Sequence, residues 1–332
     1  MVNPEFDIRP AILVGDTADV SSQRTLTILR NEGINPTVTM EFSAQRPGVF
    51  CGIKEVRALL GKVLPETGSE VWALDEGATL DAKETALRIS APYGSLGLYE
   101  TSICGILASC SGWAAAARDC VEASQGTAIV CLAARHVHPN VAANIDYSAV
   151  VGGCSSCSTI LGARLAGITP TGNIPHTLPL IIGDTVKAVQ AFDRHMPLEV
   201  PRVALVDTFK DEAEESLNVA LALREKLRGV RLDTAKERGG VTADLVKEVR
   251  ARLDLAGFRH VEIFVSGGFT PERIRKFVEV GAPVDGYGVG SHISSAPPND
   301  FTADIHEIDG KPIAKRGRTP GVTANPRLDR IM

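Results

Sequence analysis

Short apolar runs alternate with amphipathic helical stretches through the C-terminal half of the chain, and this alternation constrains the fold more than any other feature. Strands are predicted at Val203–Asp207, Val230–Asp233, Val261–Val265 and Val284–Val289, and helices at Glu212–Leu227, from about Thr242 to Leu255, and from Pro271. Apolar strands that alternate with helices are typical of a parallel sheet covered by helices. We therefore predict an α/β barrel in this half.

Polar residues interrupt these strands at or near their C-terminal ends. They are Asp207, Arg231, Asp233 and Ser266. In an α/β barrel the C-terminal ends of the strands carry the active site, whereas the opposite ends serve stability. We expect these four residues at the active-site end.

Two glycine-containing turns follow the last two predicted strands. They are Ser266-Gly267-Gly268 and Gly288-Val289-Gly290-Ser291. Glycine lets the backbone approach an anion closely, so that several N–H groups can point at the same oxygens. The alternative is that the glycines only permit tight turns. Because two strands carry such turns, we expect them to form a cup for a phosphorylated ligand.

The composition fits a soluble enzyme. The chain has 332 residues and a formal net charge of -5, without a strong basic patch, so we expect no nucleic-acid partner. Its N-terminus lacks a positive segment followed by an apolar one, and no apolar run has the length of a membrane span. We expect a cytoplasmic protein that does not bind a membrane.

The N-terminal third predicts a different architecture. A strand is expected at Val38–Phe42, a helix at Lys54–Leu64, further strands at Val71–Leu74 and Leu87–Ser90, and a long helix at Tyr99–Val121. Strands and helices in this order suggest a small α+β sheet domain. We predict an N-terminal α+β sandwich domain over residues 1–105, an α/β barrel over 106–295, and a C-terminal segment, 296–332, that returns to the N-terminal domain.

The cysteines do not suggest a disulfide framework. Their number is odd, seven, and they are scattered along the chain. Cys154 and Cys157 have the spacing of half a zinc site or a redox pair, but no second pair exists. We expect most of the cysteines to be small buried hydrophobic residues and predict no metal ligands.

The ordered motifs of the chain resemble those of nicotinate phosphoribosyltransferase, in its short archaeal and bacterial form. The resemblance runs from about Gly15 to Arg318 and rests on Tyr99-Glu100-Thr101, Ala134 to Pro139, Gly152-Gly153, Gly172 to His176, Val206-Asp207-Thr208, Val230 to Thr234 and the two glycine turns. That family belongs to the type II phosphoribosyltransferases. It implies an N-terminal sandwich domain, an irregular α/β barrel, and a homodimer or higher homo-oligomer.

The resemblance also implies a reaction. The family transfers ribose 5-phosphate from phosphoribosyl pyrophosphate to nicotinate on the salvage route to NAD, with Mg²⁺ on the pyrophosphate and with ATP coupled through a phosphorylated histidine. The histidine that matches is His176. Asp233 and Asp207 match carboxylates beside the ribose, where an oxocarbenium-like charge develops.

Basic and polar residues complete the implied site. Arg135 and Arg231 match arginines, whose planar forks suit phosphate or carboxylate. The alternative for Arg231 and Asp233 is a structural ion pair inside the barrel. The substrate-binding residues implied in all are Arg135, Arg231, Ser266, Gly267, Gly268, Gly288, Gly290 and Ser291.

Three positions depart from the family pattern around the base. Ser21 and Leu132 stand where the family has aromatic side chains that stack on the pyridine ring, and Ser155 stands where it has an acidic residue. Phe209 or Tyr287 could supply ring contacts instead, or the partner subunit could. No cysteine follows Cys157, so the cysteine-bearing metal module of longer relatives, and structural zinc, are not expected.

Three hypotheses follow. The first is an authentic nicotinate phosphoribosyltransferase, and the second is a phosphoribosyltransferase with another nitrogen heterocycle as acceptor. The third is a relative that binds a phosphoribosyl ligand without catalysis, against which His176, Arg231 and Asp233 argue. A barrel aldolase or isomerase is a distant rival, because none of the predicted strands ends in a Schiff-base lysine.

Overall fold

The chain forms two compact units, which are each described by themselves. The computed structural model describes residues 6–332. Its N-terminal unit runs to Ala116 and resumes from Ala296 to Met332, and its barrel unit runs from Ala117 to Ser295. The predicted boundary at residue 105 lies inside helix α5 (Glu100–Ala123), within the part of that helix that belongs to the N-terminal unit.

An antiparallel sheet forms the centre of the N-terminal unit. Its strand order is β13-β12-β1-β5-β3-β14, and a two-stranded sheet of β2 and β4 accompanies it. The strands are β1 (Thr37–Ala44), β2 (Gly48–Val49), β3 (Glu70–Ala73), β4 (Thr79–Leu80), β5 (Thr85–Pro92), β12 (Phe301–Ile308), β13 (Lys311–Pro312) and β14 (Asp329–Arg330). The helices are α1 (Pro10–Leu13), α2 (Val20–Asn31), α3 (Ile53–Val63) and α4 (Tyr93–Leu96).

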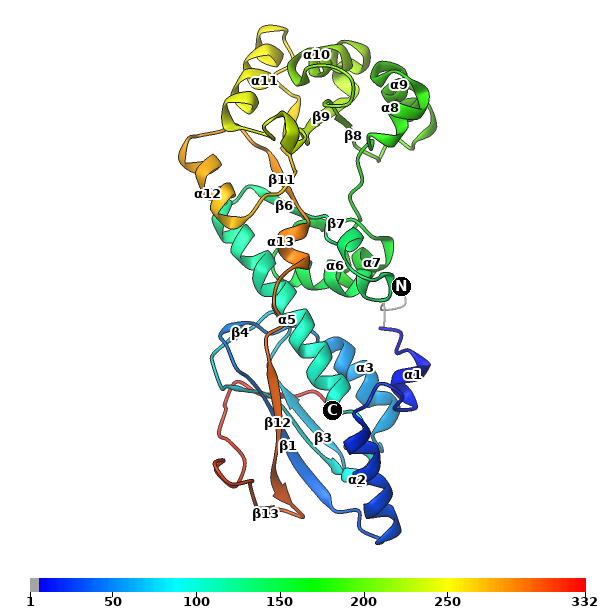
Figure 1. The fold of residues 1–332 in the computed structure, drawn as a ribbon, viewed down its shortest axis with the longest axis vertical. Helices are drawn as coiled ribbons and strands as arrows, with labels where there is room; N and C mark the ends of the chain where they lie inside the picture. The colour runs from blue at the N-terminus through cyan, green and yellow to red at the C-terminus, as the bar shows by residue number, and fades with distance from the viewer. Residues whose placement is uncertain (1–5) are drawn as a thin grey trace. The chain divides into compact units, whose positions relative to one another are not determined.

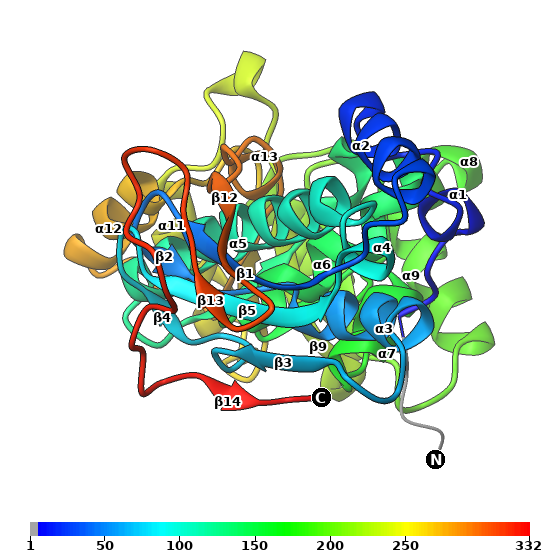
Figure 2. The same cartoon turned by 90° about the horizontal axis from the view of Figure 1, so that it is seen from below.

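Both ends of the chain build this sheet. Orange β12 lies beside blue β1 in Figure 1, paired from Val38 with Ile308 to Ala44 with Phe301. Red β14 pairs with β3, as Figure 2 shows. The C-terminal segment therefore belongs to the N-terminal unit.

The two faces of the sheet differ because side chains alternate along each strand. Val38, Met40 and Phe42 of β1 are almost fully buried and share one face with Leu87 and Ile89 of the paired β5. These residues form an apolar core. The intervening residues of both strands are polar and point to the opposite face.

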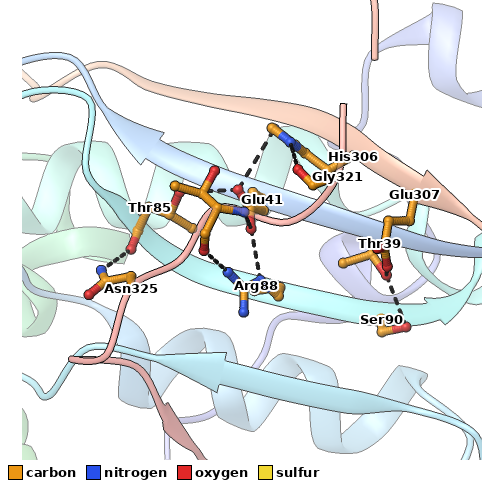
Figure 3. Close-up of polar contacts among 10 residues, drawn as sticks. Thr39, Glu41, Thr85, Arg88, Ser90, His306, Glu307, Gly321 and Asn325 are labelled. Atoms are coloured by element: carbon orange, nitrogen blue, oxygen red, sulfur yellow. Dashed lines mark hydrogen bonds and ion pairs between the residues drawn. The ribbon is translucent and has the colours of Figure 1, made fainter. Parts of the chain in front are cut away.

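Buried Glu41 is the centre of that polar face (Figure 3). Its carboxylate accepts hydrogen bonds from Arg88 Nε at 2.8 Å and Thr85 Oγ1 at 3.2 Å, and His306 Nε2 lies 3.8 Å away. The C-terminal tail joins the cluster, because the Thr323 N–H donates to Glu41 at 2.9 Å and its carbonyl accepts from Arg88. Glu41 thus fixes the tail across the sheet.

The barrel unit contains six parallel strands in the order β7-β6-β11-β10-β9-β8 (Figure 1). They are β6 (Ala128–Cys131), β7 (Ser156–Cys157), β8 (Arg202–Leu205), β9 (Leu227–Leu232), β10 (Glu262–Val265) and β11 (Gly286–Val289). β6 pairs with β11, and the sheet curves. Its two edge strands, β7 and β8, do not pair with each other. The irregular α/β barrel predicted for this half is confirmed.

An irregular segment, residues 171–174, spans the gap between β7 and β8. The Thr171 N–H donates to the Cys157 carbonyl at 2.9 Å, and the Ile174 N–H donates to the Val203 carbonyl at 3.1 Å. Ile174 also forms a parallel bridge with Ala204. This segment leads directly to His176.

Helices alternate with the strands as the sequence predicts. They are α6 (Ala142–Val151), α7 (Ile160–Ala166), α8 (Thr177–Ile182), α9 (Thr185–His195), α10 (Glu212–Leu223), α11 (Ala243–Leu255), α12 (Pro271–Glu279) and α13 (Ser291–Ser294), with short 3-10 turns η1 (Ala134–His136), η2 (Pro139–Val141), η3 (Arg224–Lys226) and η4 (Lys236–Arg238). Thr242, Thr270 and Asp211 cap α11, α12 and α10 through their side-chain oxygens, which explains where these helices begin.

The cysteines mostly behave as buried apolar residues. Six of the seven are buried and all are free thiols, with Cys104 half-buried. Burial raises the pKa of the Cys157 thiol to about 12, so it stays protonated near neutral pH. Within residues 6–332, no helix is both long and apolar enough to cross a membrane.

We predict that Glu41→Ala lowers the free energy of unfolding by about 3 kcal/mol, because it leaves the half-buried Arg88 without its carboxylate. Chemical denaturation monitored by circular dichroism measures the change. Glu70→Ala is the matched control, since the Glu70–Arg330 pair is half-exposed on both sides and should contribute less than about 1 kcal/mol. Equal losses in both variants would show that the Glu41 cluster does not stabilise the unit.

Candidate active site

Charged side chains converge where β8, β9 and β10 end. Ser266, just after β10, joins two of them: Arg231 Nε donates to its Oγ at 2.8 Å, and its hydroxyl lies 2.7 Å from Asp233 Oδ1. Arg231 Nη2 is 3.8 Å from Asp233 Oδ2. Asp207, just after β8, completes the set of residues that the sequence places at the strand ends.

His176 lies between the two carboxylates. Its Nε2 is 3.5 Å from Asp207 Oδ2 and 3.9 Å from Asp233 Oδ2. Its Nδ1 is hydrogen-bonded to Thr208 Oγ1 at 2.9 Å, which fixes the orientation of the ring. The structure therefore brings together His176, Asp207 and Asp233, the three residues predicted to be catalytic.

Asp207 is the least solvated of the three. Its side chain is 6% exposed, and its Oδ1 has no hydrogen-bond partner in the described part of the chain. Burial raises the pKa of Asp207 to about 6; the charge of His176 opposes the shift, whereas Asp233 and Glu212 add to it. Ionised Asp207 is thus energetically costly unless a cation lies nearby.

Sequence reasoning missed the groups behind these residues. Thr208 directly follows Asp207 and could have been recognised from the Val206-Asp207-Thr208 motif as a hydroxyl beside the site. Glu212 is 2% exposed and accepts a hydrogen bond from Thr234 Oγ1 at 2.7 Å, which anchors the residue after Asp233. The pattern of α10 gave no signal for Glu212, because its acidic first turn is typical of any helix start.

The two predicted glycine turns lie on neighbouring strands and adjoin the charged cluster. A Cβ built on Gly267 would lie 3.1 Å from Asp233 Oδ1, and one built on Gly288 would lie 3.2 Å from Ser266 Cβ. Gly267 and Gly268 have φ values of +92° and +70°, which side chains rarely adopt. None of the hydrogen bonds within residues 6–332 uses their N–H groups as donors.

The second turn leads into a helix. Gly290 precedes α13, and Ser291 is its exposed first residue. A side chain at Gly290 would come within 3.0 Å of His136 Nε2 and of the Leu132 carbonyl oxygen. Glycine therefore leaves the backbone of both turns accessible, as an anion cup requires.

Arg135 is exposed on η1, after β6. The pKa of Arg231 is lowered chiefly by burial, and the charge of Arg135 lowers it further, whereas Asp233 and Asp207 raise it. Arg135 therefore lies close enough to Arg231 for the two to repel. No hydrogen bond or ion pair involves the Arg135 side chain within residues 6–332.

A cavity of about 570 Å³ lies within the barrel, and it borders the charged cluster at Arg231. Its wall includes Val130, Leu132, Val203, Phe264 and Arg231. Space for the Phe264 ring exists because its neighbours across the sheet are Gly229, diagonally, and Gly286; a Cβ on either would come within 2.8 Å of the ring. The sequence did not reveal Phe264, although an aromatic residue flanked by glycines on both adjacent strands would have been the signal.

The residues that depart from the family pattern take different positions. Leu132 and Ser155 line the cavity, and Ser155 Oγ donates to the Ile129 carbonyl. Ser21 is exposed on α2 of the N-terminal unit.

The two aromatic side chains suggested as substitutes are less suitable than Phe264. Phe209 is 49% exposed. Tyr287 reaches the cavity wall, but its ring packs edge-on against Phe269 and Phe277, with centroid distances of 5.3 and 6.5 Å. Phe264, by contrast, lines the cavity beside Gly229 and Gly286.

Known proteins are similar to this chain in sequence and in fold. The model of the quinolinate phosphoribosyl transferase N-terminal domain matches residues 19–111, and that of the C-terminal domain matches residues 113–304. The crystal structure of nicotinate-nucleotide pyrophosphorylase from Pyrococcus furiosus is 40% identical, with a TM-score of 0.86 over 97% of this chain and 82% of that one.

Curated relatives carry two different activities in their names. Nicotinate phosphoribosyltransferase pncB2 of Mycobacterium tuberculosis is 32% identical over 73% of this chain and 52% of its own length, so the chain spans about half of that relative. Human nicotinate-nucleotide pyrophosphorylase [carboxylating] is 28% identical over 82% of this chain and 84% of its own. The chain therefore belongs to the quinolinate phosphoribosyl transferase family and has the type II phosphoribosyltransferase fold.

Proposed function

We propose that the protein transfers ribose 5-phosphate from phosphoribosyl pyrophosphate to nicotinate, with ATP coupled through phosphorylation of His176. The observation that carries this proposal is the position of His176 between Asp207 and Asp233, beside the glycine turn at Gly267. The two carboxylates alone would be enough to stabilise the ribose during the transfer of ribose 5-phosphate. A histidine held between them suggests an additional phosphoryl step.

The ribose-phosphate half of the site suits the donor. The oxygens of the 5-phosphate would accept hydrogen bonds from the backbone N–H groups of the Gly267–Gly268 and Gly288–Ser291 turns. Asp233 and Asp207 would then face the ribose, where they stabilise the positive charge that develops as pyrophosphate leaves. Mg²⁺ would arrive on the phosphates of the donor, and Asp207, whose Oδ1 lacks a partner among the described residues, is the carboxylate that fits it best.

The acceptor half suits a base with one carboxylate. Of the two arginines that line the cavity, Arg228 donates two hydrogen bonds to Glu262. This leaves Arg231 as the cation for a carboxylate of the base. Quinolinate carries two adjacent carboxylates and would need a second cation, but among the described residues that line the cavity the only other cation is Arg228. Phe264 can contact the pyridine ring.

The histidine step has a defined geometry. Because Thr208 holds Nδ1, the ring presents Nε2 to the space shared by the two carboxylates. A neutral imidazole nitrogen is a good acceptor for a phosphoryl group, and its bond to phosphorus would form as the bond to the ADP leaving group breaks.

A second candidate function is the decarboxylating transfer to quinolinate. The two family models that match this chain carry the name quinolinate phosphoribosyl transferase, and this observation favours it. Other nitrogen heterocycles remain alternatives for the acceptor, because Leu132 and Ser155 stand where the resemblance implies other residues. Binding without catalysis is the remaining alternative.

The first prediction concerns ATP coupling. Purified protein supplied with phosphoribosyl pyrophosphate, Mg²⁺ and nicotinate should form nicotinate mononucleotide, and ATP should raise the yield. His176→Ala should remove the ATP stimulation, because within residues 6–332 no other imidazole lies between the carboxylates. His195→Ala, on the exposed end of α9, is the matched control and should behave as wild type. Chromatographic measurement of product decides it, and ATP stimulation that survives in His176→Ala contradicts the proposed phosphohistidine.

The second prediction concerns the acceptor. The kcat/KM for nicotinate should exceed that for nicotinamide about tenfold or more, because only nicotinate pairs its carboxylate with Arg231. Quinolinate should also be a poorer substrate than nicotinate. Parallel assays with the three bases and a fixed donor concentration provide the comparison. A preference for quinolinate, with release of CO₂, would establish the second candidate instead.

The third prediction concerns the pH dependence of stability. The folded-state pKa of Asp207, about 6, lies above the ordinary 3.8, so its contribution to stability is fully present below about pH 4 and is lost as the pH rises through 6. Asp207→Asn should therefore be more stable than wild type at pH 8, by about 2 kcal/mol, and by less at pH 5. The pH dependence of Asp16→Asn, an exposed site, should match that of wild type. Denaturation midpoints at both pH values test this, and a gain independent of pH would disprove it.

A further inference from the structure

A groove with three cationic side chains lies beside the first glycine turn. Lys236, Arg273 and Lys276 line it together with Gly267 and the loop that follows β9, and none of its lining residues is acidic. None of the residues that line this groove belongs to the charged cluster around His176 and Ser266. Its composition points to an anionic ligand.

The loop after β9, residues 234–241, has a fixed shape although much of it is exposed. Thr234 anchors its start through the hydrogen bond to Glu212. Within the loop, the Gly240 N–H donates to the Ala235 carbonyl and the Gly239 N–H donates to the Lys236 carbonyl, both at 3.0 Å. These bonds set the position of Lys236 relative to Asp233, three residues earlier.

Arg273 ties this loop to the glycine turn. Its Nη1 donates to the carbonyls of Gly267 and Gly268, and its Nη2 donates to the Val241 carbonyl at 2.6 Å. The guanidinium also stacks on the Phe269 ring, 4.2 Å from the centroid. Because these contacts occupy the guanidinium, Arg273 acts as a brace for the backbone rather than as the ligand of an anion.

Lys236 is the cation that remains next to the turn. A Cβ built on Gly268 would lie 3.6 Å from Lys236 Cε and 3.9 Å from its Nζ, so the ammonium group extends over the space that glycine leaves open. Lys236 takes part in no ion pair within residues 6–332. An ammonium in this position, beside backbone N–H groups without acceptors, favours a phosphoryl group.

We propose that Lys236 is a phosphate-binding residue, which neutralises the 5-phosphate held by the Gly267–Gly268 turn. This inference rests on the proposed function, because that function places the phosphate at this turn. The short loop after β9 would then carry two substrate contacts. Asp233 at its start faces the ribose and Lys236 faces the phosphate, so the braced loop sets the separation of the two contacts.

Calorimetric titration of the free protein with ribose 5-phosphate, phosphoribosyl pyrophosphate and inorganic diphosphate tests the proposal without an acceptor base. Lys236→Met should weaken binding of the two ligands that carry a 5-phosphate about tenfold or more at low salt, because a charge-assisted contact is lost. Lys236→Arg should retain most of the affinity. Lys247→Met, an exposed lysine of α11 that does not line the groove, is the matched control and should bind as wild type.

Each other outcome has a distinct meaning. Wild-type affinity of Lys236→Met for ribose 5-phosphate would overturn the role of Lys236 and leave the proposed function intact. A loss confined to inorganic diphosphate would also overturn it, because Lys236 would then serve the leaving group. If the wild-type protein binds neither ligand with a 5-phosphate, the proposed function itself fails.

Discussion

The contact on which the site depends is the hydroxyl of Ser266 between Arg231 and Asp233. It accepts from the guanidinium and lies within hydrogen-bond distance of the carboxylate, so a cation and an anion stay near each other without collapsing into a tight pair. Two adjacent parallel strands, β9 and β10, fix the positions of these groups. Because strand register, rather than a flexible loop, sets the spacing, the charges are arranged before any substrate binds.

Small residues on the inner face of the barrel help to leave its cavity open. Gly229, Gly286 and Gly288 have no side chain to project inward, so the Phe264 ring lies over the first two and Leu132 lies over Gly288. A barrel of this size is usually filled by branched side chains. Here glycine stands at three inward positions, whereas the other face of the sheet carries aromatic contacts such as those of Tyr287 with Phe269 and Phe277.

The features that could be predicted from the sequence are those that leave a pattern in neighbouring residues. Parallel strands read as apolar runs, and polar residues stand out where those runs end, so Asp207, Arg231, Asp233 and Ser266 could be placed from sequence alone. The glycine turns could be placed for the same reason. Phe264 could not, because its environment depends on which strands are neighbours, and Lys236 could not, because its loop is shaped by contacts with Arg273 and Glu212. The predicted domain boundary at residue 105 falls inside α5, because a continuous helix gives no break in pattern where the contacts change.

The pairing of β12 with β1 has a consequence for how the chain is made. Strand β1 is complete early in synthesis, but the strand that covers its edge arrives only with residues 301–308, after the whole barrel unit. Until then the growing chain carries an exposed strand edge, which is a template for association between molecules. Contacts this distant in sequence also form slowly. The N-terminal sheet therefore gains its β12 partner and the Thr323–Glu41 bond only after the barrel unit has been synthesised.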